Sequence, residues 1–225
     1  MNCIVNTVLS GALILLLLGA IDMLYSRSSM LGEQTRRIIH VAAGLVALSF
    51  PVLICTHWHL LILAVIFTTL MFVTYKLGLL PSVHRISRPS VGAFLYPVAI
   101  YIPFLVFSIK QDSLYFFIPV LIMALCDPLA AWVGTSLHKS QEGGLKKTVA
   151  GSAAFAIAAF IISLLLFITA SDFSIPAAFV WSICIALITA GAERWSYYGW
   201  DNLTIPLAAI GGLVVVESLS GAILF

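Results

Sequence analysis

The residues that could carry acid–base or phosphate chemistry fall into four short polar segments of an apolar chain. The first segment reads "EQTRRIIH" from Glu33, and the second reads "HRISRPS" from His84. The third begins with Asp127, inside the run "YFFIPVLIMALCDPLAAWVG", and continues to "HKSQEGGLKKTVAGS". The fourth holds Glu193 and the pair Asp201-Asn202. Ionisable groups in apolar runs are costly and usually face a cavity or a partner, so these segments are candidates for one functional site.

Cations, glycines and hydroxyls combined with acids suit a phosphate ligand and its metal ion. Lys146 and Lys147 can neutralise phosphate oxygens. Backbone N–H groups at Gly143, Gly144 and the start of the next helix can cradle them. Carboxylate and amide oxygens are hard ligands that suit Mg²⁺. The residues that offer such oxygens are Asp127, Glu193, Asp201 and Asn202.

Each of these assignments has a purely structural alternative. The lysines also satisfy the rule that cytoplasmic connections are basic. Asp127 could form a salt bridge to a nearby Arg or Lys. Asp201 or Asn202 could cap the last helix, a role compatible with ligand binding. The convergence of four polar segments favours the ligand site.

Other polar residues give weaker signals. The soluble phosphate loop GxxxxGK[ST] is absent, because Lys146 stands where that motif needs a glycine. His57 and His59 flank a tryptophan and are interpreted as membrane-interface residues rather than metal ligands. Glu217 is either a buried, hydrogen-bonded acid or part of a polar lining. The four cysteines, at positions 3, 55, 126 and 184, form no CxxC pair and are expected to be small packing residues.

The composition identifies an integral membrane protein. Of the 225 residues, 62% are hydrophobic and only 9% are charged, whereas soluble domains carry about 25% charged residues. The net charge of +2 is too small to indicate a nucleic-acid partner. No internal repeat and no soluble domain is visible.

The apolar runs predict an all-α, polytopic bundle of transmembrane helices. A span needs about 20 apolar residues, and the runs fall near 4–24, 38–55, 58–76, 91–109, 114–134, 149–170, 175–191 and 203–223. The seventh run is short, so seven or eight spans are expected. The chain is read as a single domain, 1–225, with a nucleotide-binding connection at about 134–152.

The positions of the cations predict the orientation. Of the 11 Lys and Arg residues, all but Lys110 lie in the first, third, fifth or seventh connection. By the positive-inside rule these connections face the cytoplasm, which places both termini outside if there are eight spans. The polar segments are then on the cytoplasmic side.

With these residues laid out, the chain resembles the dolichol kinase and phytol kinase family of CTP-using lipid-alcohol kinases. It is more distantly similar to the phosphatidate cytidylyltransferases. The resemblance runs from about residue 33 to about residue 209. Four stretches carry it: "EQTRRIIHVAAG", "HRISRPSVGAFLYPVAIY", "CDPLAAWVGTSLHKSQEGGLKKTVAGSAAF" and "GAERWSYYGWDNLTIPLAA". The last two are the most specific.

The resemblance implies transfer of the γ-phosphoryl group of a nucleoside triphosphate, usually CTP, to an isoprenoid alcohol, with Mg²⁺ at a cytoplasm-facing site. It implies catalytic roles for Asp127, Glu193 and Lys147, and metal ligation by Asp127, Asp201 and Asn202. The nucleotide-binding residues expected are Lys139, Lys146, Lys147, Thr148, Gly151, Ser152, Arg36, Arg37, His40 and Arg85. The proton acceptor is expected to be Asp127 or Glu193, with His40 and His84 as weaker candidates. After Gly134 the chain reads "TSLHK" where many members carry a basic residue and a second glycine, which leaves CTP, UTP and ATP open as donors.

Two rival functions follow from the same residues. A cytidylyltransferase would use CTP but direct attack to the α-phosphate and release pyrophosphate. A small ion-coupled transporter would place its acids near the membrane midplane and often shows inverted repeats. The stretch "DNLTIP" and the clustering of polar groups at one surface favour the kinase. The expected partners are a lipid alcohol, a nucleoside triphosphate, the bilayer of a bacterial inner membrane and, as a further option, a second copy of the chain.

Overall fold

The computed structural model describes residues 2–27, 32–84, 89–138 and 147–223. All regular structure within these ranges is helical, and eight helical segments are long and apolar enough to cross a membrane. The predicted all-α membrane bundle is therefore confirmed, with eight candidate spans rather than seven.

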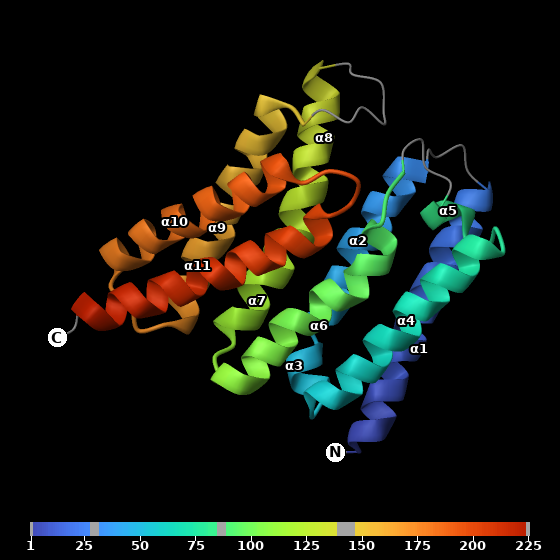
Figure 1. Ribbon diagram of the computed structural model, residues 1–225, viewed down its shortest axis with the longest axis horizontal. Coiled ribbons are helices and arrows are strands. Elements are labelled where there is room, and N and C mark those ends of the chain that lie inside the picture. The colour runs from blue at the N-terminus through green and yellow to red at the C-terminus, as the bar shows by residue number, and fades with distance from the viewer. Residues whose placement is uncertain (1, 28–31, 85–88, 139–146, 224–225) are drawn as a thin grey trace.

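The first four spans form one half of the molecule. They are α1 (Cys3–Arg27), α2 (Gly32–Ala47) continued by the short α3 (Phe50–Leu53), α4 (His57–Lys76) and α6 (Gly92–Lys110). The one-turn helix α5 (Pro81–His84) lies between α4 and α6 along the chain. Figure 1 shows α1, α2, α4 and α6 side by side, with α6 nearest the other half.

The other half contains the last four spans. The fifth span consists of α7 (Leu114–Leu121), a π-helical turn η1 (Ile122–Cys126) and α8 (Asp127–His138). It is followed by α9 (Val149–Ala170), α10 (Ile175–Trp195) and α11 (Asp201–Ile223). Among the described spans, the fifth is the most buried, with 56% of its most apolar window inside the protein. It contacts both halves and serves as the central helix (Figure 1).

Several helices extend further toward the polar side than the hydropathy pattern predicts. Helix α2 begins at Gly32, so Arg36, Arg37 and His40 lie on a helix and not in a connection. Likewise, Glu193 lies in the last turns of α10, and Asp201 begins α11. The predicted boundaries were wrong here because an apolar run ends at the first charged residue, whereas the backbone hydrogen bonds of the helix continue through charged residues. The polar groups are consequently held on rigid helix ends.

A close contact fixes α2 against the central helix. Gly44 faces Ala124 of η1, and a Cβ atom at position 44 would lie 2.3 Å from the Cβ of Ala124 and 2.9 Å from the hydroxyl of Tyr96. Small residues allow membrane helices to approach in this way. The first half is thereby held against the turn that precedes Asp127.

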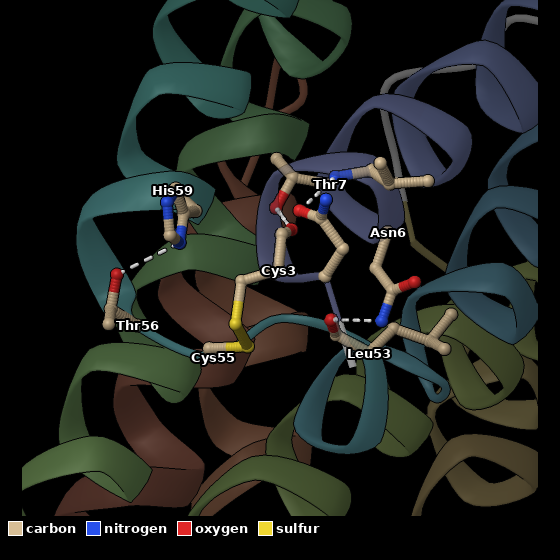
Figure 2. The surroundings of a disulfide bond; sticks show 9 residues. Cys3, Asn6, Thr7, Leu53, Cys55, Thr56 and His59 are labelled. Carbon is tan, nitrogen blue, oxygen red and sulfur yellow. Dashed lines mark hydrogen bonds between the residues drawn. A yellow bond between two sulfur atoms is a disulfide. The ribbon is translucent and has the colours of Figure 1, made fainter.

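The prediction that all four cysteines are packing residues was wrong for two of them. Cys3 and Cys55 form a disulfide, with their Cα atoms 5.8 Å apart, which joins the start of α1 to the connection before α4 (Figure 2). Nearby, the amide of Asn6 donates to the carbonyl of Leu53 at 3.3 Å. Cys126 and Cys184 are thiols, the first buried and the second half-buried. The pair depends on three helices folding back on one another, which residue spacing does not reveal.

Glu217 has a definite partner at the end of the bundle remote from Asp201. Its two carboxylate oxygens lie 2.9 and 2.7 Å from the ammonium nitrogen of Lys110, and Tyr115 donates a hydrogen bond to the same group. Because the Glu217 and Lys110 side chains are 53% and 39% exposed, this pair contributes little free energy of folding. It joins α6 to α11 outside the polar cluster.

Candidate active site

Lys147 lies at the centre of the polar residues, just before α9. Its Nζ atom is 2.8 Å from Oε1 of Glu193 on α10 and 3.1 Å from Oδ2 of Asp201 on α11. The exposed fractions of these three side chains are 16%, 4% and 12%. We call these three residues the ion triad. A cation and two acids this poorly exposed interact strongly, and removal of one member leaves uncompensated buried charge.

The ion triad keeps Lys147 protonated. Burial by itself lowers the pKa of an ammonium group, but the carboxylates of Asp201, Asp127 and Glu193 outweigh it and raise the pKa of Lys147 above its usual value. Lys147 is therefore a permanent cation at neutral pH, as a group that neutralises phosphate oxygens must be.

The predicted phosphate loop continues into the first turn of α9. Thr148 caps this helix, because its Oγ1 accepts a hydrogen bond from the backbone N–H of Gly151 at 3.0 Å. Ser152 donates to Oε2 of Glu193 at 3.0 Å, and Arg194 donates to the carbonyl oxygen of Lys147. The segment from Lys147 to Ser152 is thus tied to the end of α10.

Two glycines allow α8 and α9 to approach each other closely beside this loop. A Cβ atom at Gly151 would lie 2.7 Å from the carbonyl oxygen of Ala130, and one at Gly134 would lie 2.7 Å from Oγ1 of Thr148. The predicted ligand Gly151 is therefore also required for helix packing. Lys139 and Lys146 lie outside the described residues, as does Arg85.

Asp127 follows the π-helical turn and belongs to the same charged environment. Asp201, Lys147, Glu193 and Arg36 all lie near enough to act electrostatically on its carboxyl group. Within the described ranges, no hydrogen-bond donor contacts that carboxyl group. Single π-turns inside helices recur at functional sites because they redirect a side chain and free backbone carbonyls. Here the turn places this acid beside the ion triad.

His40 supports this turn. Pro128 has no N–H with which to bond the carbonyls one turn earlier. The ring of His40 donates from Nε2 to one of these, the oxygen of Met123, at 3.0 Å. The hydroxyl of Tyr96 in turn donates to the carbonyl oxygen of His40 at 2.7 Å. The structure thus gives the predicted nucleotide ligand His40 a role in holding the backbone before Asp127.

Arg36 and Asn202 meet beside Gly92. The amide nitrogen of Asn202 donates to the carbonyl of Gly92 at 2.8 Å, which leaves its Oδ1 as the atom that a cation could bind. A Cβ atom at Gly92 would lie 2.4 Å from Nη2 of Arg36. The Nη1 atom of Arg36 is buried and has no hydrogen-bond partner among the described residues. A buried donor without a partner is costly and indicates an absent acceptor.

Gly199 is a packing position beside the site that sequence reasoning missed. Gly199 adopts a φ of 86°, which favours glycine, and a Cβ atom there would lie 2.5 Å from the backbone nitrogen of Gly92. The backbone N–H of Val91 donates to the carbonyl of Tyr198 at 2.8 Å. Gly199 could have indicated this close approach, because a glycine there stands just before the long apolar run of α11.

The other predicted residues that the structure describes lie on α2, α4 and α5. Arg37 is half-buried on α2 beside Arg36. His84 pairs through Nε2 with the hydroxyl of Thr74 at 3.0 Å. His57 and His59 lie at the start of α4, where their partners are the hydroxyls of Tyr101 and Thr56.

The described residues contain no group of three or more His, Cys, Asp or Glu side chains arranged to hold a metal ion. Mg²⁺ commonly uses only one or two protein carboxylates and takes its other ligands from phosphates and water. Asp127, Asp201 and Oδ1 of Asn202 are hard oxygen donors that fit such an ion. These residues are thus suited to a cation that arrives with a nucleotide.

An apolar cavity adjoins the polar cluster. It lies among α1, α2, α4 and α6 and has a volume of about 100 Å³. Its polar lining residues are Arg36, His40, Tyr96 and Asn202. Because Arg36 and Asn202 are next to Gly92 at the start of α6, the cavity runs from the charged cluster into the membrane-spanning part of the bundle.

Comparison with known proteins gives one informative match. No family model matches the chain, and no solved structure matches it. The chain is 31% identical over 179 residues to the phytol kinase of Synechocystis sp., an alignment that covers 79% of this chain and 76% of that protein. This match confirms the family that the four stretches resemble, and the chain belongs to the phytol kinase family.

Proposed function

We propose that this protein is a membrane-embedded kinase that transfers the γ-phosphoryl group of CTP to the hydroxyl of an isoprenoid alcohol. The observation that carries the proposal is the position of Lys147. This cation is held between Glu193 and Asp201, beside Asp127. Phosphoryl transfer needs charge neutralisation and alignment more than covalent help from the protein.

Lys147 and Arg36 are the described cations that bind the triphosphate. Lys147 exchanges part of its contact with carboxylates for contact with phosphate oxygens. Arg36 supplies a buried guanidinium N–H that has no acceptor among the described residues. Further positive charge comes from cations in the same polar segments of the sequence, namely Lys139, Lys146, Arg37 and Arg85. The choice of CTP as the donor rests on the family resemblance.

Bound Mg²⁺ would neutralise charge on the phosphate groups, and Asp127, Asp201 and Asn202 are the residues that would hold it. In the transfer, the oxygen of the alcohol forms a bond to the γ-phosphorus. The bond between that phosphorus and the bridging oxygen of the β-phosphate breaks, and CDP leaves. The hydroxyl proton passes to a carboxylate of the protein.

Asp127 is the better of the two predicted proton acceptors. Both carboxylate oxygens of Glu193 are already bound, one by Lys147 and the other by Ser152. Among the described residues, none donates a hydrogen bond to the Asp127 carboxylate. Asp127 is also near Arg36, which lines the cavity. Glu193 then acts by positioning Lys147 and Ser152.

We further propose that the active site faces the cytoplasm of a bacterium, with both termini outside the inner membrane. The distribution of Lys and Arg supports this orientation. The disulfide between Cys3 and Cys55 supports it independently. The disulfide lies at the start of α1 and just before α4, and the ion triad lies at the opposite end of the bundle. Disulfides persist in oxidising compartments, so the end of the bundle that holds the disulfide is expected to face away from the cytoplasm.

Reporter fusions test the orientation. Alkaline phosphatase fused after the last residue should be active, whereas green fluorescent protein at the same place should stay dark. Fusions within the connection at 139–146 should give the reverse pattern. Fluorescence from the C-terminal fusion together with phosphatase activity in that connection would contradict the proposed orientation.

Replacement of the proposed base tests the mechanism. Asp127→Asn keeps the size of the side chain but removes its ability to accept a proton, so transfer to the alcohol should fall by at least about a hundredfold. The matched control is Asp172→Asn, an exposed acid in the connection after α9, which should retain full activity. The rate of label transfer from CTP is measured on protein with wild-type thermal unfolding. Activity of Asp127→Asn within a few-fold of wild type would refute this role.

Replacement of the central cation tests nucleotide binding. A ligand that binds the folded state raises its stability, so CTP with Mg²⁺ should raise the unfolding temperature of the wild-type protein. Lys147→Met should abolish this rise and should itself unfold at a lower temperature, because Glu193 and Asp201 lose their shared cation. The control, Lys76→Met, removes an exposed lysine at the end of α4 and should keep the rise. An undiminished rise in Lys147→Met would show that the nucleotide binds elsewhere.

A further inference from the structure

We infer that Arg36 holds the phosphoryl group that is transferred and stays bound to it on the lipid product, whereas Lys147 holds the phosphates that leave with CDP. This inference rests on the proposed function and deepens it. It divides the two described phosphate-binding cations between the two products, a lipid monophosphate and a nucleoside diphosphate. The protein should then bind a lipid monophosphate in the absence of any nucleotide.

The two cations have different surroundings. The Nζ atom of Lys147 lies 2.8 Å from an oxygen of Glu193 and 3.1 Å from an oxygen of Asp201, so its charge is already compensated. The Nη1 atom of Arg36 is buried and has no hydrogen-bond partner among the residues that the structure describes. A buried donor of this kind is costly until an acceptor reaches it. Of the two cations, Arg36 is therefore the one that still requires an acceptor.

Gly92 leaves room for the guanidinium group of Arg36. A Cβ atom at position 92 would lie 2.4 Å from Nη2 of Arg36 and 2.8 Å from the amide nitrogen of Asn202. That amide nitrogen donates to the carbonyl of Gly92 at 2.8 Å, which holds Asn202 at the same glycine. The Nη2 side of the guanidinium group is thus packed against the start of α6, and Nη1 remains for a ligand. A guanidinium group held in this way suits the fixed geometry of a phosphate group.

Arg36 also lies at the boundary between the charged residues and an apolar cavity. The residues that line the cavity include Arg36 and Asn202 but none of Lys147, Glu193 and Asp201. Most of the other lining residues are aliphatic or aromatic. A phosphate group that contacts Arg36 therefore has hydrocarbon beside it, as the phosphate of a lipid monophosphate does. A phosphate group that contacts Lys147 has carboxylates beside it and suits a nucleotide with its Mg²⁺.

Both cations lie close to the proposed proton acceptor. Arg36 and Lys147 are each near enough to Asp127 to act on the charge of its carboxyl group. In the transfer, the γ-phosphorus exchanges its bond to the bridging oxygen of the β-phosphate for a bond to the alcohol oxygen, and the alcohol proton passes to Asp127. A cation that contacts the γ-phosphoryl oxygens throughout this exchange stabilises their charge in the transition state. Arg36 is in position to do so and then to retain the lipid phosphate.

Binding of the two products to single variants tests this division. Radiolabelled farnesyl monophosphate, and separately radiolabelled CDP with Mg²⁺, is added to the purified protein in detergent. Arg36→Gln should bind farnesyl monophosphate at least about tenfold more weakly than wild type, because a hydrogen bond to a charged group is lost, and should bind CDP within about threefold of wild type. Lys147→Met should show the opposite pattern. The control, Arg27→Gln, removes an exposed arginine at the end of α1 and should match wild type with both probes.

Two competitors identify the part of the probe that the wild-type protein recognises. Farnesol has the tail without the phosphate, and inorganic phosphate has the charge without the tail. Neither should displace labelled farnesyl monophosphate at the concentration at which the unlabelled probe displaces half of it. Displacement by inorganic phosphate would show a site for free phosphate ions. Equal displacement by farnesol would show that the phosphate adds nothing to binding, and either result would contradict the inference.

Three results with the variants overturn the inference. The first is a folded wild-type protein that binds no farnesyl monophosphate. The second is wild-type affinity of Arg36→Gln for this probe, which would show that Arg36 does not hold the lipid phosphate. The third is an equal loss of both probes in Arg36→Gln, which would show that the two products share one phosphate site. These comparisons need only the wild type and Arg36→Gln, so they stand even if Lys147→Met does not fold.

Gly92→Ala tests the same contact without removal of the charge, and it replaces Arg36→Gln should that variant fail to fold. The added Cβ atom must displace the end of the Arg36 side chain. The affinity for farnesyl monophosphate should therefore fall, and the affinity for CDP should stay at the wild-type value. In a protein that also carries Arg36→Gln, Gly92→Ala should cause no further loss, because changes that act through one contact are not additive. A further loss in the double variant would contradict an effect through Arg36.

These binding measurements need no phosphoryl transfer, so they separate this inference from the proposed function. Binding of farnesyl monophosphate that depends on Arg36 supports a lipid-phosphate site even if no label passes from CTP to an alcohol, a result that would refute the proposed kinase. Transfer of γ-label by the wild type, together with normal binding of farnesyl monophosphate by Arg36→Gln, would refute the inference and leave the kinase intact.

Discussion

The ion triad of Lys147, Glu193 and Asp201 is the interaction on which the rest of the structure depends. Its members come from the start of α9, the end of α10 and the start of α11, so one cation joins three helix ends at the same face. Charge this poorly exposed is stable only when it is paired. The site therefore cannot release Lys147 to a ligand unless the ligand brings charges of its own. A nucleoside triphosphate with Mg²⁺ provides both signs, anionic oxygens for Lys147 and a cation for the acids. The charge pairing that stabilises the ion triad is therefore also the pairing that the proposed ligand would replace.

The central helix connects this charged cluster to the cavity. Its π-turn precedes Asp127 and Pro128, and His40 of the first half satisfies a carbonyl of that turn. Gly44 brings α2 within contact of Ala124 in the same turn. The half that contains the cavity and the half that contains the ion triad thus meet where the proposed proton acceptor lies. In this account, the alcohol and the nucleotide are brought together at Asp127.

The sequence predicts the charged site residues, because charged side chains are costly in a membrane and therefore rare. It does not predict features that depend on contacts between distant helices. Asp127, Lys147, Glu193 and Asp201 stand out because charges are rare in this chain, and the structure brings them together. The cavity gives no such signal, since Ala64 or Leu60 reads like any lipid-facing residue. The disulfide was missed because Cys3 and Cys55 meet only after three helices fold together. The role of His40 at Met123 was missed because a π-turn has no spacing pattern of its own.

The most direct test of this account is the fate of each phosphate of CTP. Purified protein in detergent is given Mg²⁺, geranylgeraniol or phytol, and CTP labelled at either the γ- or the α-phosphate. Phosphatidate is offered in parallel as the acceptor for a cytidylyltransferase. The account predicts that γ-label enters the alcohol, that CDP is released, and that α-label stays in the water-soluble fraction. Entry of α-label into a lipid with release of pyrophosphate would contradict it, as would the absence of γ-label from every lipid in protein shown to be folded.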